Sequence, residues 1–89
     1  MSEIKELEQA VDEFAAAMKA RLRSKAKQGL RGWQGMGREY LGDRLLMNAA
    51  KGAVKGEKKS LVDAANLAMM IHRAGQRLES AASGAGRLH

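Results

Sequence analysis

Residues 2–22, SEIKELEQAVDEFAAAMKARL, carry large apolar side chains three or four positions apart. This spacing favours an all-α fold. These side chains belong to Ile4, Leu7, Val11, Phe14, Met18 and Leu22. This spacing puts them on one face of an α-helix, as in a bundle helix or a dimer helix. Ser2 suits the N-cap, and Gly29 suits the left-handed residue that follows a helix end. We therefore predict a helix over residues 3–28.

Beyond this helix, the sequence predicts two more helices separated by glycines. Four glycines within residues 29–37 indicate a loop, followed by a helix over residues 38–54 that Gly56 ends. Ser60 is expected to cap a third helix over residues 60–80, with Asp63 completing a capping-box-like pair. Residues 83–89 are expected to be a flexible tail. The predicted fold is all-α and forms one domain over residues 1–82, with a long N-terminal helix, a Gly-rich loop and an antiparallel helical pair.

The composition predicts a thin core and narrows the classes of function. The chain has 89 residues, and 16 of its 40 apolar residues are alanine, so we expect a homo-oligomer that completes an oligomeric bundle. The absence of cysteine excludes disulfides and cysteine-based metal sites. No metal and no cofactor are expected.

The sequence shows no apolar run of membrane-spanning length and no signal-peptide core, so we expect a cytoplasmic protein that does not bind a membrane.

Positive charge is concentrated in residues 19–38, which hold seven Lys or Arg and no acid, whereas residues 1–18 carry a net charge of −4. Cations beside glycine backbone amides and an aromatic ring are typical of sites that bind phosphate and stack a base. The predicted anion-binding or nucleotide-binding residues are Lys25, Lys27, Arg31, Trp33, Arg38 and Arg44. The other interpretation is a solvated basic face, with Trp33 packing against the end of the bundle.

Acidic residues that could support catalysis are few. Metal-dependent phosphate chemistry on helices needs several carboxylates at one point, and the candidates are Glu39, Asp43 and Asp63. Each also has a structural explanation, as a helix-terminal acid or a partner of arginine. Asp63 and Asn66, three residues apart, form a possible polar site. No catalytic residue is predicted.

Residues 25–71 resemble short phage and bacterial MazG-like, all-α nucleoside triphosphate pyrophosphohydrolases. The resemblance lies in Lys27 with the turn to Gly32-Trp33, in Tyr40-Leu41 with Arg44-Leu45, and most specifically in LVDAANLAMMI at residues 61–71. It implies a helical dimer or tetramer that binds nucleotides. Active members hold magnesium with Glu-Glu-x-x-Glu and Glu-x-x-Asp motifs. Here residues 44–51 have no carboxylate, and only Asp63 matches the second motif, which implies that the metal site has been lost.

The sequence therefore favours a non-catalytic helical protein that binds a nucleotide-like or other phosphate-rich anion. A phage-encoded protein that sequesters nucleotides or inhibits a host protein fits this description. Three alternatives stay open: a small basic nucleic-acid-binding protein, a residual magnesium-dependent nucleoside triphosphate pyrophosphohydrolase, and a protein–protein interaction module built on the first helix.

Overall fold

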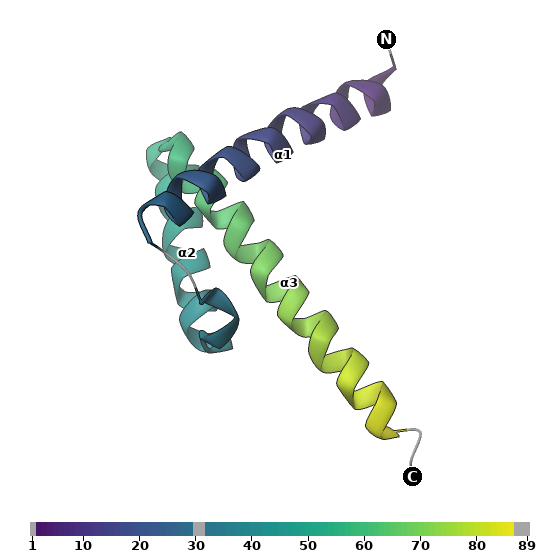
Figure 1. Cartoon of the computed structure of the whole chain (residues 1–89). Coiled ribbons are helices and arrows are strands. Elements are labelled where there is room, and N and C mark those ends of the chain that lie inside the picture. Colours follow the sequence, from purple (N-terminus) through teal and green to yellow (C-terminus); the bar gives the residue numbers. More distant parts are fainter. Residues whose placement is uncertain (1, 30–31, 87–89) are drawn as a thin grey trace.

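The fold consists of three α-helices and one short 3-10 turn (Figure 1). The computed structural model describes residues 2–29 and 32–86, and no strand occurs in those ranges. The elements are α1 (Glu3–Lys27), η1 (Trp33–Gly35), α2 (Arg38–Lys55) and α3 (Lys58–Gly86). The predicted all-α, three-helix unit is confirmed. Its oligomeric state stays a prediction.

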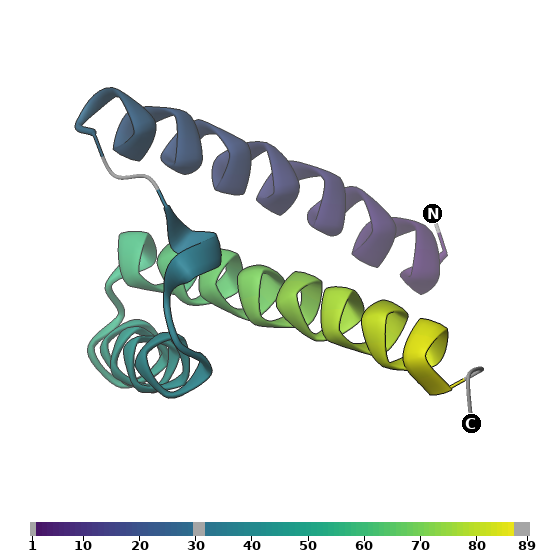
Figure 2. The same cartoon turned by 60° about the horizontal axis from the view of Figure 1, so that its bottom comes forward.

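The helices pack around the first half of α3. A short turn at Gly56 and Glu57 joins α2 to α3, and these two helices make the most extensive contact. α1 contacts α3 through its C-terminal half, and the N-terminal half of α1 diverges from α3 in Figure 1. Figure 2 shows the first part of α3 between α1 and α2. No helix in the described ranges has the length and apolar content needed to cross a bilayer.

The ends of α1 and α2 follow the predicted capping chemistry. The Ser2 side chain accepts a hydrogen bond from the Lys5 amide at 3.3 Å, as an N-cap should. Gly29 and Gly56 have positive φ angles of 86° and 74°, a conformation that side chains disfavour and glycine adopts freely. These residues therefore end the helices near the positions that the sequence predicted.

The two ends of α3 differ from the prediction. The helix begins at Lys58, and the amides of Ser60 and Leu61 both donate to the Glu57 carbonyl, so Ser60 is a buried residue of the first turn and not its cap. At the other end, α3 continues to Gly86, past the predicted end at residue 80 and into the predicted tail. The alanines at positions 81, 82 and 85 favour this continuation because alanine has the highest helix propensity, whereas Gly84 and Gly86 oppose it. Residues 87–89 of the predicted tail lie outside the described residues.

The core is small, as the composition predicted. Among the residues whose burial is described, Leu41 and Ala64 are the buried apolar side chains, and α1 contributes none. Leu41 is only 2% exposed. Gly52 is also buried, at a point where α2 and α3 approach so closely that Leu61 lies against the Gly52 backbone. The stability of the chain therefore depends on a few close contacts.

Replacing Gly52 by alanine should destabilise this contact. A Cβ atom at Gly52 would lie 2.5 Å from Leu61 Cγ and 3.0 Å from the Leu61 amide nitrogen, so the helices must move apart. Overpacking of this kind lowers the free energy of unfolding by about 1–3 kcal/mol. Urea denaturation followed by circular dichroism measures the effect. Gly42→Ala is the matched control: a Cβ there meets nothing within 4 Å, and a gain of about 0.5–1 kcal/mol is expected. Equal stability of the two variants would contradict the close approach.

Candidate anion-binding pocket

A pocket of about 580 Å³ lies between the end of α1, the η1 turn, the start of α2 and the middle of α3. Its volume is in the range of about 300–1,000 Å³ that is typical of small-molecule sites. The lining combines cations, aromatic rings and an apolar floor. These residues include Lys25, Trp33, Tyr40, Arg44, Leu41, Leu67 and Met70.

Two local features bring the functional groups to this pocket. Gly32 has a φ of 79° directly before η1, and the Met36 amide donates to the Trp33 carbonyl at 3.1 Å. This turn holds Trp33 half-buried at the pocket. In α2, Tyr40 and Arg44 are four residues apart and so lie on one face of the helix, with Leu41 buried beside them.

The structure brings together three of the six predicted anion-binding residues. Lys25, Trp33 and Arg44 line the pocket. Lys27 and Arg38 are exposed and do not line it. Arg31 lies outside the described residues. Sequence reasoning missed Tyr40 as a pocket residue, although its spacing of four from Arg44 was a signal that the two share a face.

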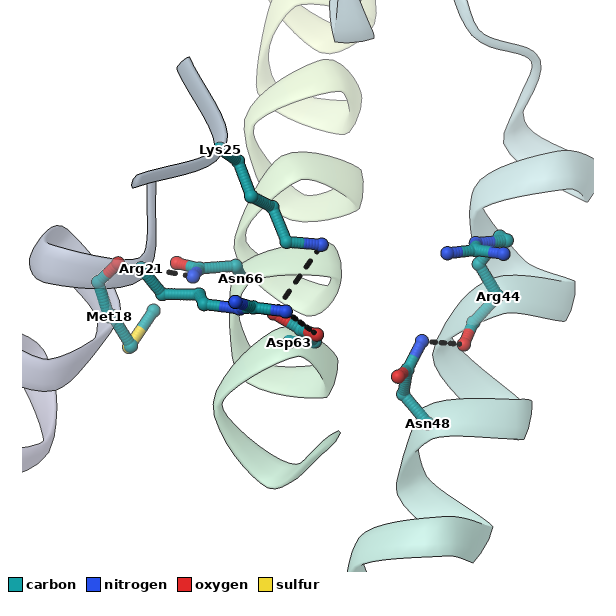
Figure 3. A network of polar contacts seen from close by, with 7 residues as sticks. All are labelled: Met18, Arg21, Lys25, Arg44, Asn48, Asp63 and Asn66. Atoms are coloured by element: carbon teal, nitrogen blue, oxygen red, sulfur yellow. Dashed lines mark hydrogen bonds and ion pairs between the residues drawn. The ribbon is translucent and has the colours of Figure 1, made fainter. Parts of the chain in front are cut away.

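Beside the pocket, a polar cluster fastens α1 to α3 (Figure 3). Arg21 donates to both carboxylate oxygens of Asp63, at 2.9 Å from Nε to Oδ1 and 3.2 Å from Nη2 to Oδ2. Lys25 Nζ lies 3.5 Å from Asp63 Oδ1. A carboxylate that pairs with a guanidinium through two hydrogen bonds forms one of the stronger polar contacts in proteins. Asp63 is therefore occupied in joining two helices, and the predicted capping role is wrong.

Asn66 makes a second connection between the same helices. The side chain is buried, with 4% of its surface exposed, and its Nδ2 donates to the Met18 backbone carbonyl at 3.2 Å. Met18 lies where α1 crosses α3, so this bond fixes the position of the crossing (Figure 3). Asp63 and Asn66, predicted as a possible polar site, lie together on the α3 face that meets α1. Both hold α1, Asp63 through Arg21 and Asn66 through the Met18 carbonyl, which gives them a structural role.

The charges around Asp63 shift its protonation equilibrium. Partial burial, the largest single influence, raises the pKa of Asp63, but the hydrogen bond from Arg21 and the charges of Lys25 and Arg21 together lower it below the usual value. The hydrogen bond to Asp63 in turn raises the pKa of Arg21, against the opposing effect of burial. The ionised pair is thus the favoured state of the fold at neutral pH.

This shift predicts a pH dependence of stability. Because the pKa of Asp63 is lower in the folded than in the unfolded chain, the ionised carboxylate stabilises the fold at pH values above its ordinary pKa of 3.8. That contribution should disappear as the pH falls through the lowered folded value. Urea denaturation at a series of pH values should show less loss on acidification for Asp63→Asn than for the natural chain. Asp43→Asn, at an exposed position of α2, is the control and should keep the natural profile.

The described residues offer little to a metal ion. Within residues 2–29 and 32–86, no group of three or more His, Cys, Asp or Glu side chains is placed to hold one. Of the three predicted candidates, Asp63 pairs with Arg21 and Lys25, whereas Glu39 and Asp43 are exposed on α2. The arrangement is suited to binding an anion through cations and aromatic rings. The prediction that the chain has no catalytic residue stays a prediction.

Comparison with protein-family models, with curated proteins and with solved structures finds no match to this chain. The resemblance to MazG-like enzymes therefore stays a prediction from the residues that carry it.

Proposed function

We propose that the chain binds a nucleotide-like, phosphate-bearing anion in this pocket and does not transform it chemically. The observation that carries the proposal is the convergence of Lys25 from α1 and Arg44 from α2 on a pocket that Trp33 and Tyr40 also line. Figure 3 shows the Lys25 amine and the Arg44 guanidinium pointing toward the space between α3 and α2. Two cations and two rings match the two chemical parts of a nucleotide, its phosphates and its base.

Each part of the pocket has a distinct physical role in this proposal. The Arg44 guanidinium presents several N–H donors in one plane, which suits the oxygens of a phosphate. Lys25 supplies a second, more mobile charge, although it also pairs with Asp63 at 3.5 Å. Trp33 offers a ring face for a base, and stacking of this kind contributes about 1–3 kcal/mol. Leu67 and Met70 form an apolar floor that favours a planar, partly apolar ligand.

A titration of Trp33 fluorescence tests the proposal. Trp33 is the single tryptophan of the chain, so its emission reports the pocket directly. Adenosine and its mono-, di- and triphosphates, with inorganic triphosphate as a ring-free control, should change the emission with an affinity that rises with phosphate number. The nucleoside and inorganic triphosphate should each bind more weakly than the nucleoside triphosphate. If no compound changes the emission and native mass spectrometry detects no complex, the proposal is overturned.

Nucleic-acid binding is the second candidate function, and a separate surface favours it. Lys19, Arg23 and Lys27 are exposed on α1 and follow one another at four-residue spacing. Such a row suits a phosphate backbone, and neutralising several phosphates makes affinity fall steeply with salt. At a slope of about −0.9 per neutralised phosphate, three contacts correspond to a loss of roughly 40-fold between 50 and 200 mM salt. Titration with a duplex at these two salt concentrations separates this candidate from pocket binding, whose affinity should change far less.

A further inference from the structure

Lys25 has a carboxylate on one side and the pocket on the other. Its side chain lines the pocket, and its Nζ atom lies 3.5 Å from Oδ1 of Asp63. That separation exceeds the usual hydrogen-bond range of about 2.7–3.2 Å, so the contact is a loose ion pair. In Figure 3 the Lys25 amine points toward the space between α3 and α2. A phosphate in the pocket and the Asp63 carboxylate would therefore attract the same amine.

Arg21 holds the Asp63 carboxylate much more closely than Lys25 does. Its Nε donates to Oδ1 at 2.9 Å and its Nη2 donates to Oδ2 at 3.2 Å, so each oxygen already accepts a hydrogen bond. A guanidinium that bonds both oxygens of a carboxylate forms one of the stronger charged contacts. The Asp63 side chain is also shielded from water, with 12% of its surface exposed. Arg21 and Asp63 do not line the pocket, so any effect that they have on a bound anion is indirect.

We propose that Arg21 is a positioning residue of the anion-binding pocket: by occupying the Asp63 carboxylate, it leaves the Lys25 amine available to a phosphate. This inference rests on the proposed function and names what regulates the affinity of the same site. Without the guanidinium, the carboxylate would draw Lys25 into a closer pair, because a shielded charge without a partner is unfavourable. An anion would then have to break that pair before it could bind Lys25.

The proposal gives Arg21 and Asp63 opposite effects on affinity, although the two side chains form one contact. Removing the guanidinium ties Lys25 to Asp63, whereas removing the carboxylate charge releases Lys25 to the pocket. If the contact served only to join α1 to α3, the loss of either partner would break it, and both substitutions would weaken binding. The sign of the Asp63 effect therefore distinguishes positioning of Lys25 from a purely structural role.

Titration of Trp33 fluorescence with adenosine triphosphate measures these effects. We expect Arg21→Gln to bind roughly 3- to 10-fold more weakly than the natural chain, and Asp63→Asn to bind roughly 2- to 5-fold more tightly. The double variant should bind within about twofold of Asp63→Asn, because Arg21 acts through the carboxylate. Arg21→Lys keeps a cation beside Asp63 and should lose less affinity than Arg21→Gln. Circular dichroism checks the helix content of each variant, and Arg21→Lys replaces Arg21→Gln in the test if the latter does not fold.

Two exposed residues supply the charge controls. Arg23→Gln on α1 and Asp43→Asn on α2 change the net charge by the same amounts and lie outside the pocket lining. Both should keep the natural affinity to within about twofold. Shifts in these controls that equal those at Arg21 and Asp63 would assign the effect to net charge and overturn the proposal.

The other outcomes separate this inference from the proposed function. Unchanged binding by Arg21→Gln, weaker binding by Asp63→Asn, or a loss from Arg21→Gln that persists in the Asp63→Asn background would each overturn the role of Arg21. Those results would leave the proposed function standing, because the natural chain would still bind adenosine triphosphate. A natural chain that binds no phosphate compound would overturn the proposed function and this inference together.

Discussion

Leu41→Ala should lower the free energy of unfolding by about 2–5 kcal/mol, the range measured when a leucine is truncated in a packed core. Leu41 is 2% exposed and is the largest fully buried side chain among the residues whose burial is described. In a core this small, few neighbouring side chains are available to fill the resulting cavity. The effect is therefore expected to be a large fraction of the total stability of a domain of this size.

Leu46→Ala on the same helix is the matched control for this prediction. Leu46 is 70% exposed, so the same truncation removes little buried surface and should change the free energy of unfolding by no more than about 0.5 kcal/mol. Both values come from urea denaturation followed by far-ultraviolet circular dichroism, at one protein concentration so that association does not contribute. Similar losses for the two variants would contradict the orientation of α2.

This pair of leucines shows how far the sequence could predict the core. The helix predicted over residues 38–54 is confirmed, and its sequence carries several large apolar side chains, among them Leu41, Leu45 and Leu46. These apolar side chains spread over more of the α2 surface than α3 contacts. α1 covers little of the remainder, so some of the leucines stay exposed. Which leucine is buried depends on how the helices cross, and periodicity within one helix does not contain that information.

Asp63 illustrates a second limit of sequence reasoning. Its spacing of three from Ser60 suggested a local cap, whereas its partner Arg21 is 42 residues away in sequence. A local pattern can indicate only local pairs, so the ion pair between α1 and α3 was not predictable from it. The concentration of cations in residues 19–38 predicted an anion-binding site, which stays a prediction. Part of its explanation is structural, since Arg21 and Lys25 serve the contact with α3.

The sequence predicted only some of the residues that line the pocket. Trp33 was predicted as a site residue because it lies among cations and glycines in the sequence, and it is half-buried at the pocket. Arg38 and Arg44 could not be distinguished by charge alone. The difference arises from the start of α2 at Arg38, which places position 44, together with position 40, on the side of the helix that faces the pocket.

Arg44→Gln should weaken the binding of a nucleoside triphosphate by roughly 10- to 100-fold, whereas Arg38→Gln should leave it nearly unchanged. A hydrogen bond to a charged group contributes about 1.5–3 kcal/mol, and each 1.4 kcal/mol corresponds to a tenfold change in affinity. Arg44 lines the pocket, and Arg38 is exposed outside it. The two variants remove the same charge from the same helix, so a nonspecific electrostatic attraction would weaken binding equally in both. Trp33 fluorescence measures both affinities, and equal losses would assign the binding to the overall positive charge of the chain instead of the pocket.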